Sequence, residues 1–244
     1  MSVGVQRTEG TIGVETTSAS VTDDSEVPLR HIAIIDPGTR VPELDCFNQL
    51  ARRSPVPLTY HLPALFGVDS LHRASDQLLG IVLLGSGASP LDGEAWQQDL
   101  DGWLLPRLAA DVPALGLCYG HQHLAHRLGG EIGFVFEDQH KLKGLREVHL
   151  DADRLWGEAR SGRMIVSHRE MVTRLPEGFV TLASHPDIPV EAFGHPRRPI
   201  WGFQAHPEAT EAFAVNNSVP FDAPPETLAF GHGLVRRFLA FAAG

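Results

Sequence analysis

The chain has 244 residues and a formal net charge of −10, from 20 Lys and Arg against 30 Asp and Glu. An acidic balance of this kind argues against general binding to nucleic acid or to anionic membrane surfaces. No apolar run approaches the ~20 residues that cross a bilayer, and no apolar signal core begins the chain, so we expect a cytoplasmic protein.

The first 28 residues differ in composition from the rest of the chain. They are rich in Thr, Ser, Gly and acidic residues and carry little periodic apolar pattern. Such a segment is typical of a flexible tail, or of an arm that packs on another surface. We therefore predict a flexible tail at 1–28 and a domain at 29–244.

Predicted strands and helices alternate through the first half of that domain. Apolar runs predict four strands, at 31–36, 56–62, 81–84 and 112–117. Helical patterns between them predict helices at 41–53, 71–79 and 96–110. This alternation favours an open α/β fold, with a mostly parallel, doubly wound sheet and helices on both faces. Functional loops in such sheets lie at the carboxyl ends of the strands.

The pattern changes after Gly130, where short apolar runs are separated by Gly, Pro and Asp. These runs predict strands at 148–150, 164–166, 179–183, 190–193 and 199–204. We expect them to form a small antiparallel portion that folds back on the main sheet. A broad apolar face at 224–243 predicts a closing helix.

Cys118 lies between the fourth predicted strand and a helix-like segment at 123–128. Gly116 and Gly120 stand two residues to either side, the spacing of a nucleophile elbow with Cys in place of Ser. Glycines there permit a sharp turn, and the start of a helix lowers the pKa of a thiol. The alternative is a buried core cysteine, which is the interpretation we favour for Cys46.

A second motif, His206-Pro207-Glu208, follows the last predicted strand. A nucleophilic cysteine needs a base, and a base is commonly oriented by a carboxylate. In an extended segment, residues two apart point the same way, so we expect His206 and Glu208 to face one pocket.

Together, the Gly-Leu-Cys-Tyr-Gly-His-Gln elbow and Gln-Ala-His-Pro-Glu resemble the class I (triad) glutamine amidotransferases, and within them the amidotransferase domain of GMP synthases. The resemblance implies a flavodoxin-like fold and amide hydrolysis through a γ-glutamyl thioester, without a cofactor. It assigns Cys118 as the nucleophile, His206 as general base and acid, and Glu208 as the orienting carboxylate.

The Gly-rich stretch at 83–90 is similar to the loop that supplies an oxyanion-hole amide in this family. The resemblance implies that the amide of Gly87 contributes, although a shift to Ser86 is possible, together with the amide of Tyr119. Two preset N–H donors would stabilise the oxyanion. The loop lacks the Gly-Lys-Ser/Thr ending of a phosphate loop, so we do not expect nucleotide binding there.

The stretch at 165–172 is similar to a Ser-His-Gly-Asp region that lines the glutamine pocket in relatives. The resemblance implies that Ser167 and His168 line the pocket and that Gln122 grips the substrate. A purely structural role for His168 remains open. Arg169 and Glu170 replace the usual Gly-Asp, a departure at the pocket mouth.

Histidines at 121, 123 and 126 do not predict a metal site, because the Cys and carboxylate ligands of a zinc pattern are missing. We expect no metal.

The destination of the ammonia is open. The chain shows no Ser-Gly-Gly-x-Asp-Ser loop of an ATP-pyrophosphatase domain. We therefore expect ammonia to pass to a separate synthetase subunit, or to be released without a partner. One alternative is a γ-glutamyl peptidase or hydrolase that acts on a γ-glutamyl conjugate, and another is a regulatory module that kept the fold without catalysis.

Overall fold

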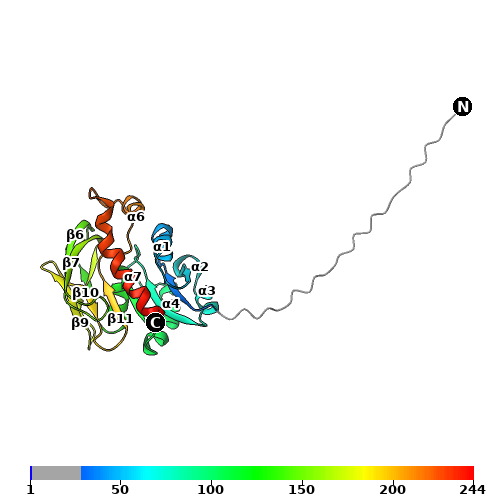
Figure 1. Cartoon of the computed structure of the whole chain (residues 1–244), viewed down its shortest axis with the longest axis horizontal. Helices are drawn as coiled ribbons and strands as arrows, with labels where there is room; N and C mark the ends of the chain where they lie inside the picture. The colour runs from blue at the N-terminus through cyan, green and yellow to red at the C-terminus, as the bar shows by residue number, and fades with distance from the viewer. Residues whose placement is uncertain (2–28) are drawn as a thin grey trace.

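The computed structural model of the chain describes Met1 and residues 29–244 (Figure 1). The predicted tail, apart from Met1, lies outside the described residues, so its prediction is not tested. No described helix is both long and apolar enough to cross a membrane.

A seven-stranded sheet forms the centre of the molecule. Its strands are β1 (His31–Ile35), β2 (Leu58–His61), β3 (Leu78–Leu83), β4 (Ala114–Leu117), β9 (Val180–His185), β10 (Ile188–Gly194) and β11 (Ile200–Phe203). They lie in the order β2-β1-β3-β4-β11-β10-β9. The first five in this order are parallel, and β10 pairs antiparallel with both of its neighbours, β11 and β9. The predicted fold class, a mostly parallel sheet with an antiparallel portion, is confirmed.

Helices cover both faces of this sheet. They are α1 (Leu44–Ala51), α2 (Pro63–Phe66), α3 (Asp69–Arg73), α4 (Ala95–Ala109), α5 (Tyr119–Arg127), α6 (Glu211–Asn216) and α7 (Ala229–Ala243), with a 3-10 turn at Pro225–Leu228. Alternate strand residues point to opposite faces. Ile32 and Ile34 join the core cluster that includes α7, whereas Ala33 and Ile35 join the cluster of α4 and α5. Figure 1 shows α7 lying across one face.

The predicted helix at 71–79 is wrong in its second half. The helix α3 ends at Arg73, and β3 already begins at Leu78. Gln77 has a φ of 61°, which turns the chain, and its carbonyl accepts a hydrogen bond from His31 N–H at 3.2 Å. Pairing with β1 therefore overrides the helical spacing of the apolar residues in this segment.

The segment between α5 and β9 forms two small antiparallel pairs. They are β5 (Glu131–Phe134) with β8 (Glu170–Arg174), and β6 (Leu142–Leu150) with β7 (Arg160–His168). The sequence predicted only residues 148–150 at the end of β6 and residues 164–166 in the middle of β7. It missed β5 and β8, because β5 has no buried residue and so lacks the alternation that marks a half-buried strand.

Candidate active site

The nucleophile elbow lies at the carboxyl end of β4, between the parallel strands β3 and β11. Cys118 has φ 51° and ψ −101°, a conformation that costs free energy in a non-glycine residue. Its N–H donates to the Phe203 carbonyl at 2.8 Å, and its carbonyl accepts from Gln122 N–H at 3.0 Å. The helix α5 therefore begins at Tyr119, four residues before the predicted helix, and aims its N-terminus at the thiol.

The two flanking glycines are required by close backbone contacts. A Cβ on Gly116 would collide with the carbonyl oxygen of Gly120, and a Cβ on Gly120 would collide with that of Leu83. The first turn of α5 thus packs directly on β3 and β4, which holds Cys118 at the carboxyl end of β4.

His206 and Glu208 follow β11, the strand beside β4. His206 Nδ1 lies 2.9 Å from Glu208 Oε1, and both side chains are buried. The expectation of an extended segment is wrong, because Ala209 N–H donates to the His206 carbonyl at 3.2 Å and closes a turn. The turn brings the two side chains together. His206 N–H also donates to the Ile165 carbonyl at 2.8 Å, which anchors the loop to β7.

His206 and Cys118 share one small space. A Cβ on Gly85 would lie 2.8 Å from His206 Cε1 and 3.7 Å from Cys118 Cβ, so the absence of a side chain at Gly85 admits the ring. Burial lowers the pKa of His206, but the negative charges of Cys118 and Glu208 outweigh it and raise the pKa to about 10. Among the described residues, His206 Nε2 has no hydrogen-bond partner.

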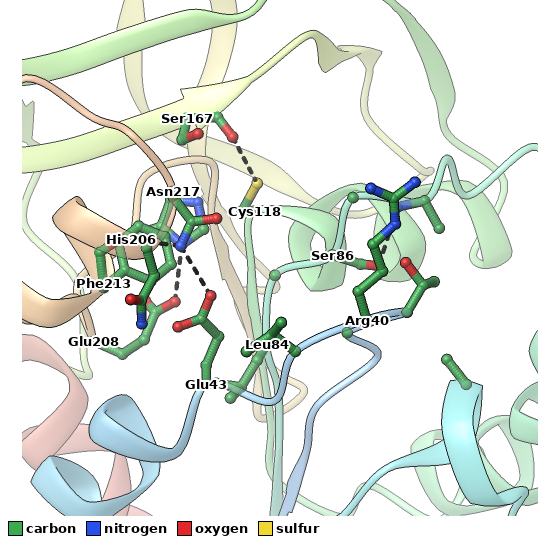
Figure 2. Close-up of a pocket in the computed structure, with 18 of the residues that line it drawn as sticks. Arg40, Glu43, Leu84, Ser86, Cys118, Ser167, His206, Glu208, Phe213 and Asn217 are labelled. Carbon is green, nitrogen blue, oxygen red and sulfur yellow. Dashed lines mark hydrogen bonds and ion pairs between the residues drawn. The ribbon is translucent and has the colours of Figure 1, made fainter.

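A cavity of about 920 Å³ opens above these groups (Figure 2). Its lining includes Cys118, His206, Glu208 and the loop 84–88. Gly87 lies on this wall, and within the described part of the chain neither its N–H nor that of Tyr119 finds an acceptor. One of these free amides follows Cys118 in the chain and the other belongs to the cavity wall, so both are candidate donors for an oxyanion hole.

Ser86 fixes the shape of the Gly-rich loop. Its hydroxyl donates to the Pro37 carbonyl at 2.7 Å and accepts from Ala88 N–H at 3.1 Å. The loop after β3 is thereby attached to the loop after β1.

The three predicted substrate residues are placed differently from one another. Ser167 lines the cavity, and its carbonyl oxygen lies 4.0 Å from Cys118 Sγ. Gln122 and His168 are buried behind the lining. Gln122 Nε2 donates to the Glu170 carbonyl at 2.6 Å, and His168 Nδ1–H donates to the same oxygen at 2.9 Å. Burial lowers the pKa of His168 to about 4, so the ring is neutral.

The replacement of Gly-Asp by Arg169-Glu170 does not open the wall. Glu170 is buried and accepts a hydrogen bond from Ser89 Oγ at 2.7 Å, so its carboxylate links β8 to the loop after β3. Arg169 is only partly buried.

The sequence analysis missed lining residues that no motif marks. Glu43 Oε1 accepts from Asn217 Nδ2 at 2.9 Å, which joins the segment before α1 to the end of α6 on the same cavity wall as His206. Burial raises the pKa of Glu43. In Figure 2, Glu43, Asn217 and Phe213 lie with His206 on one side of Cys118, and Arg40 lies with Ser86 on the other.

Comparison with protein families places the chain among amidotransferases. The family model "Glutamine amidotransferase class-I" matches residues 70–215. A GMP synthase (glutamine-hydrolyzing) of Thermosynechococcus vestitus is 31% identical over 183 residues, which are 74% of this chain and 32% of that protein. The enzyme of the same name from Rhodopseudomonas palustris is 32% identical over 200 residues, 79% of this chain and 35% of that protein. The chain spans about a third of the length of these relatives.

Solved structures show the same fold at lower identity. A glutamine amidotransferase from Thermotoga maritima is 18% identical, with a TM-score of 0.65 over 87% of this chain and 97% of that one. A second, from Methylobacillus flagellatus, is 17% identical, with a TM-score of 0.64 over 87% and 93%. The family match and the GMP synthase relatives confirm the resemblance seen in the motifs: the chain belongs to the class I glutamine amidotransferase family.

Proposed function

We propose that this chain hydrolyses the side-chain amide of glutamine through a thioester on Cys118, releasing glutamate and ammonia. The observation that carries the proposal is the meeting of Cys118, His206 and Glu208 at one cavity, although they come from two separate strand ends. Membership of the family supports the substrate class.

The proposed reaction begins with proton transfer from Cys118 Sγ to His206 Nε2. Glu208, 2.9 Å from His206 Nδ1, raises the pKa of His206 and so favours this imidazolium–thiolate pair. The thiolate attacks the carboxamide carbon, and the amides of Tyr119 and Gly87 stabilise the oxyanion. His206 returns its proton to the leaving ammonia. Water, deprotonated by His206, then attacks the thioester, and glutamate leaves while the thiol is reformed.

The three predicted substrate residues have different proposed roles at the cavity wall. Ser167 faces the substrate, because its carbonyl lies beside the sulfur. Gln122 and His168 act from behind by holding the Glu170 carbonyl, and so fix the strand ends that form the wall. We propose that the released ammonia passes to a separate synthetase subunit, in a reducing cytoplasm that keeps the thiol free.

The two cysteines provide the test. Cys118→Ala should lower glutamine hydrolysis by at least ~10⁴-fold, because the nucleophile is lost. Cys46→Ala is the matched control: this thiol is buried and lies outside the cavity lining, so hydrolysis should persist. Hydroxylamine should convert the thioester to γ-glutamyl hydroxamate in the wild type but not in Cys118→Ala. Unchanged ammonia release by Cys118→Ala, or turnover of γ-glutamyl conjugates but not of glutamine, would refute the proposal.

A further inference from the structure

One buried side chain joins the two segments that carry the proposed oxyanion donors. Gln97 extends from the first turn of α4 and is fully buried. Its Nε2 donates one hydrogen to the Ser89 carbonyl at 2.8 Å and the other to the Tyr119 hydroxyl oxygen at 2.9 Å. Its Oε1 accepts from Glu94 N–H at 2.9 Å. The amide is therefore held at both ends, and its two hydrogens tie the Gly87 loop to the elbow.

An ion pair at the other end of the network fixes the direction of these bonds. Asp101 lies 2.7 Å from His123 Nε2 and 2.8 Å from Arg127 Nε. A carboxylate only accepts, so His123 Nε2 carries a hydrogen. In the neutral ring Nδ1 is then the acceptor, and the Tyr119 O–H donates to it at 3.1 Å. Burial raises the pKa of Tyr119, which keeps its hydroxyl protonated. The Tyr119 oxygen is then free to accept from Gln97.

We propose that Gln97 is a positioning residue that sets the geometry of the oxyanion hole. The inference rests on the proposed function, in which Tyr119 and Gly87 donate to the oxyanion. The ring of Tyr119 is anchored by its hydroxyl, and its peptide N–H opens α5. Ser89 is two residues beyond Gly87. Without the Gln97 amide, the two donors can separate, and donors stabilise an oxyanion only within about 3 Å.

The same geometry predicts a selective kinetic effect. Oxyanion donors act on the transition state, whereas Ser167 and the rest of the cavity wall bind the ground state. Loss of the Gln97 amide should therefore lower kcat and leave KM nearly unchanged. A buried amide with no such role would affect stability alone.

The experiment compares Gln97→Met with two controls on the same helix. Gln98→Met changes the same residue type one position along, where the side chain is exposed and donates only to the Gly93 carbonyl. Arg107→Gln removes a second polar network of α4, to Ser75 and the Trp103 carbonyl, and controls for lost stability. Tyr119→Phe is a milder variant that keeps the aromatic ring but removes the hydroxyl. Kinetics on glutamine, thermal unfolding and amide hydrogen exchange are measured for each.

We expect kcat to fall ~10- to 100-fold in Gln97→Met and several-fold in Tyr119→Phe, with KM within about twofold, since a fully lost donor costs ~10²–10³. Both controls should keep the kcat of the wild type. The Gln122 amide, which bonds Cys118 O in the first turn of α5, should exchange faster in Gln97→Met than in Arg107→Gln.

An unchanged kcat in Gln97→Met would overturn the proposal, and so would a rise in KM that accounts for the loss of activity. A wild-type chain that does not hydrolyse glutamine would refute the proposed function instead. The exchange rate of Gln122 would then decide the role of Gln97, because it needs no turnover: equal rates in Gln97→Met and Arg107→Gln would overturn it.

Discussion

The elbow side and the histidine side of the cavity are built on different physical principles. On the elbow side, hydrogen bonds of the Gln97 amide and close backbone contacts hold Cys118, Tyr119 and the Gly-rich loop. On the histidine side, His206 lies against the charged Glu208, with Glu43 nearby (Figure 2). Backbone geometry therefore places Cys118, whereas buried charge sets the protonation of His206.

The contrast predicts how each side responds to substitution. A change of charge on the histidine side should change kcat for glutamine and the pH dependence of stability. An increase in side-chain volume on the elbow side should lower the stability of the fold, because the packing at Gly116 and Gly120 leaves no room for a methyl group.

Loss of the base on the histidine side should have the largest effect. We expect His206→Gln to lower kcat for glutamine by ~10³-fold, within the usual range for general acid–base catalysis. The measurement is steady-state ammonia release, with His185→Gln, a surface substitution outside the cavity, as the control. Activity within tenfold of the wild type would show that His206 is not the base.

A methyl group on the elbow side tests steric control. Gly120→Ala would drive a Cβ into the Leu83 carbonyl, so we expect the free energy of unfolding to fall by about 1–3 kcal/mol. Gly102→Ala, in the middle of α4 with no atom near the added carbon, should instead gain about 0.5–1 kcal/mol. Urea unfolding measures both. Equal stability in the two variants would contradict the close contact of α5 with β3.

The smallest expected effect tests charge on the histidine side. The folded pKa of His206 is raised from 6.5 to about 10, so the protonated ring stabilises the fold below pH ~6.5, and this stability is lost as the pH rises toward 10. Glu208→Gln removes one of the charges that raise the pKa. Between pH 7 and 10 we expect the wild type to lose about 1 kcal/mol more than this variant, the free energy of roughly one pKa unit. Denaturant titrations at several pH values measure the difference, and parallel curves would contradict the coupling.

Features that depend on neighbouring residues could be predicted from the sequence, whereas features that depend on distant contacts could not. The strand before Cys118 was predicted because its apolar run is local, and the parallel direction of the first strands followed from the alternation of strands and helices. The order of these strands in the sheet was not predicted. The predicted helix at 71–79 failed in part because pairing with β1 outweighs local spacing at Leu78. The turn from His206 to Ala209 was not predicted. The two-residue spacing of His206 and Glu208 suggested an extended segment, in which the two side chains would also face the same way.

The substrate wall shows the same limit. Ser167, His168 and Gln122 were grouped by motif, but only Ser167 lines the cavity. Which side of a strand or helix faces the cavity depends on how the elements pack. Residues such as Glu43 belong to no motif and enter the site only because α1 and α6 meet there.

The sequence by itself determined the fold class, the family and the chemical types at Cys118, His206 and Glu208, because each is encoded in short runs of neighbouring residues. Only the tertiary structure decided that Gln97 joins Ser89 to Tyr119. It also decided that Gln122 and His168 both donate to the Glu170 carbonyl. The physical reason is that a hydrogen bond between distant segments depends on register, rotamer and burial together. A local pattern constrains each of these weakly, and packing fixes all three at once.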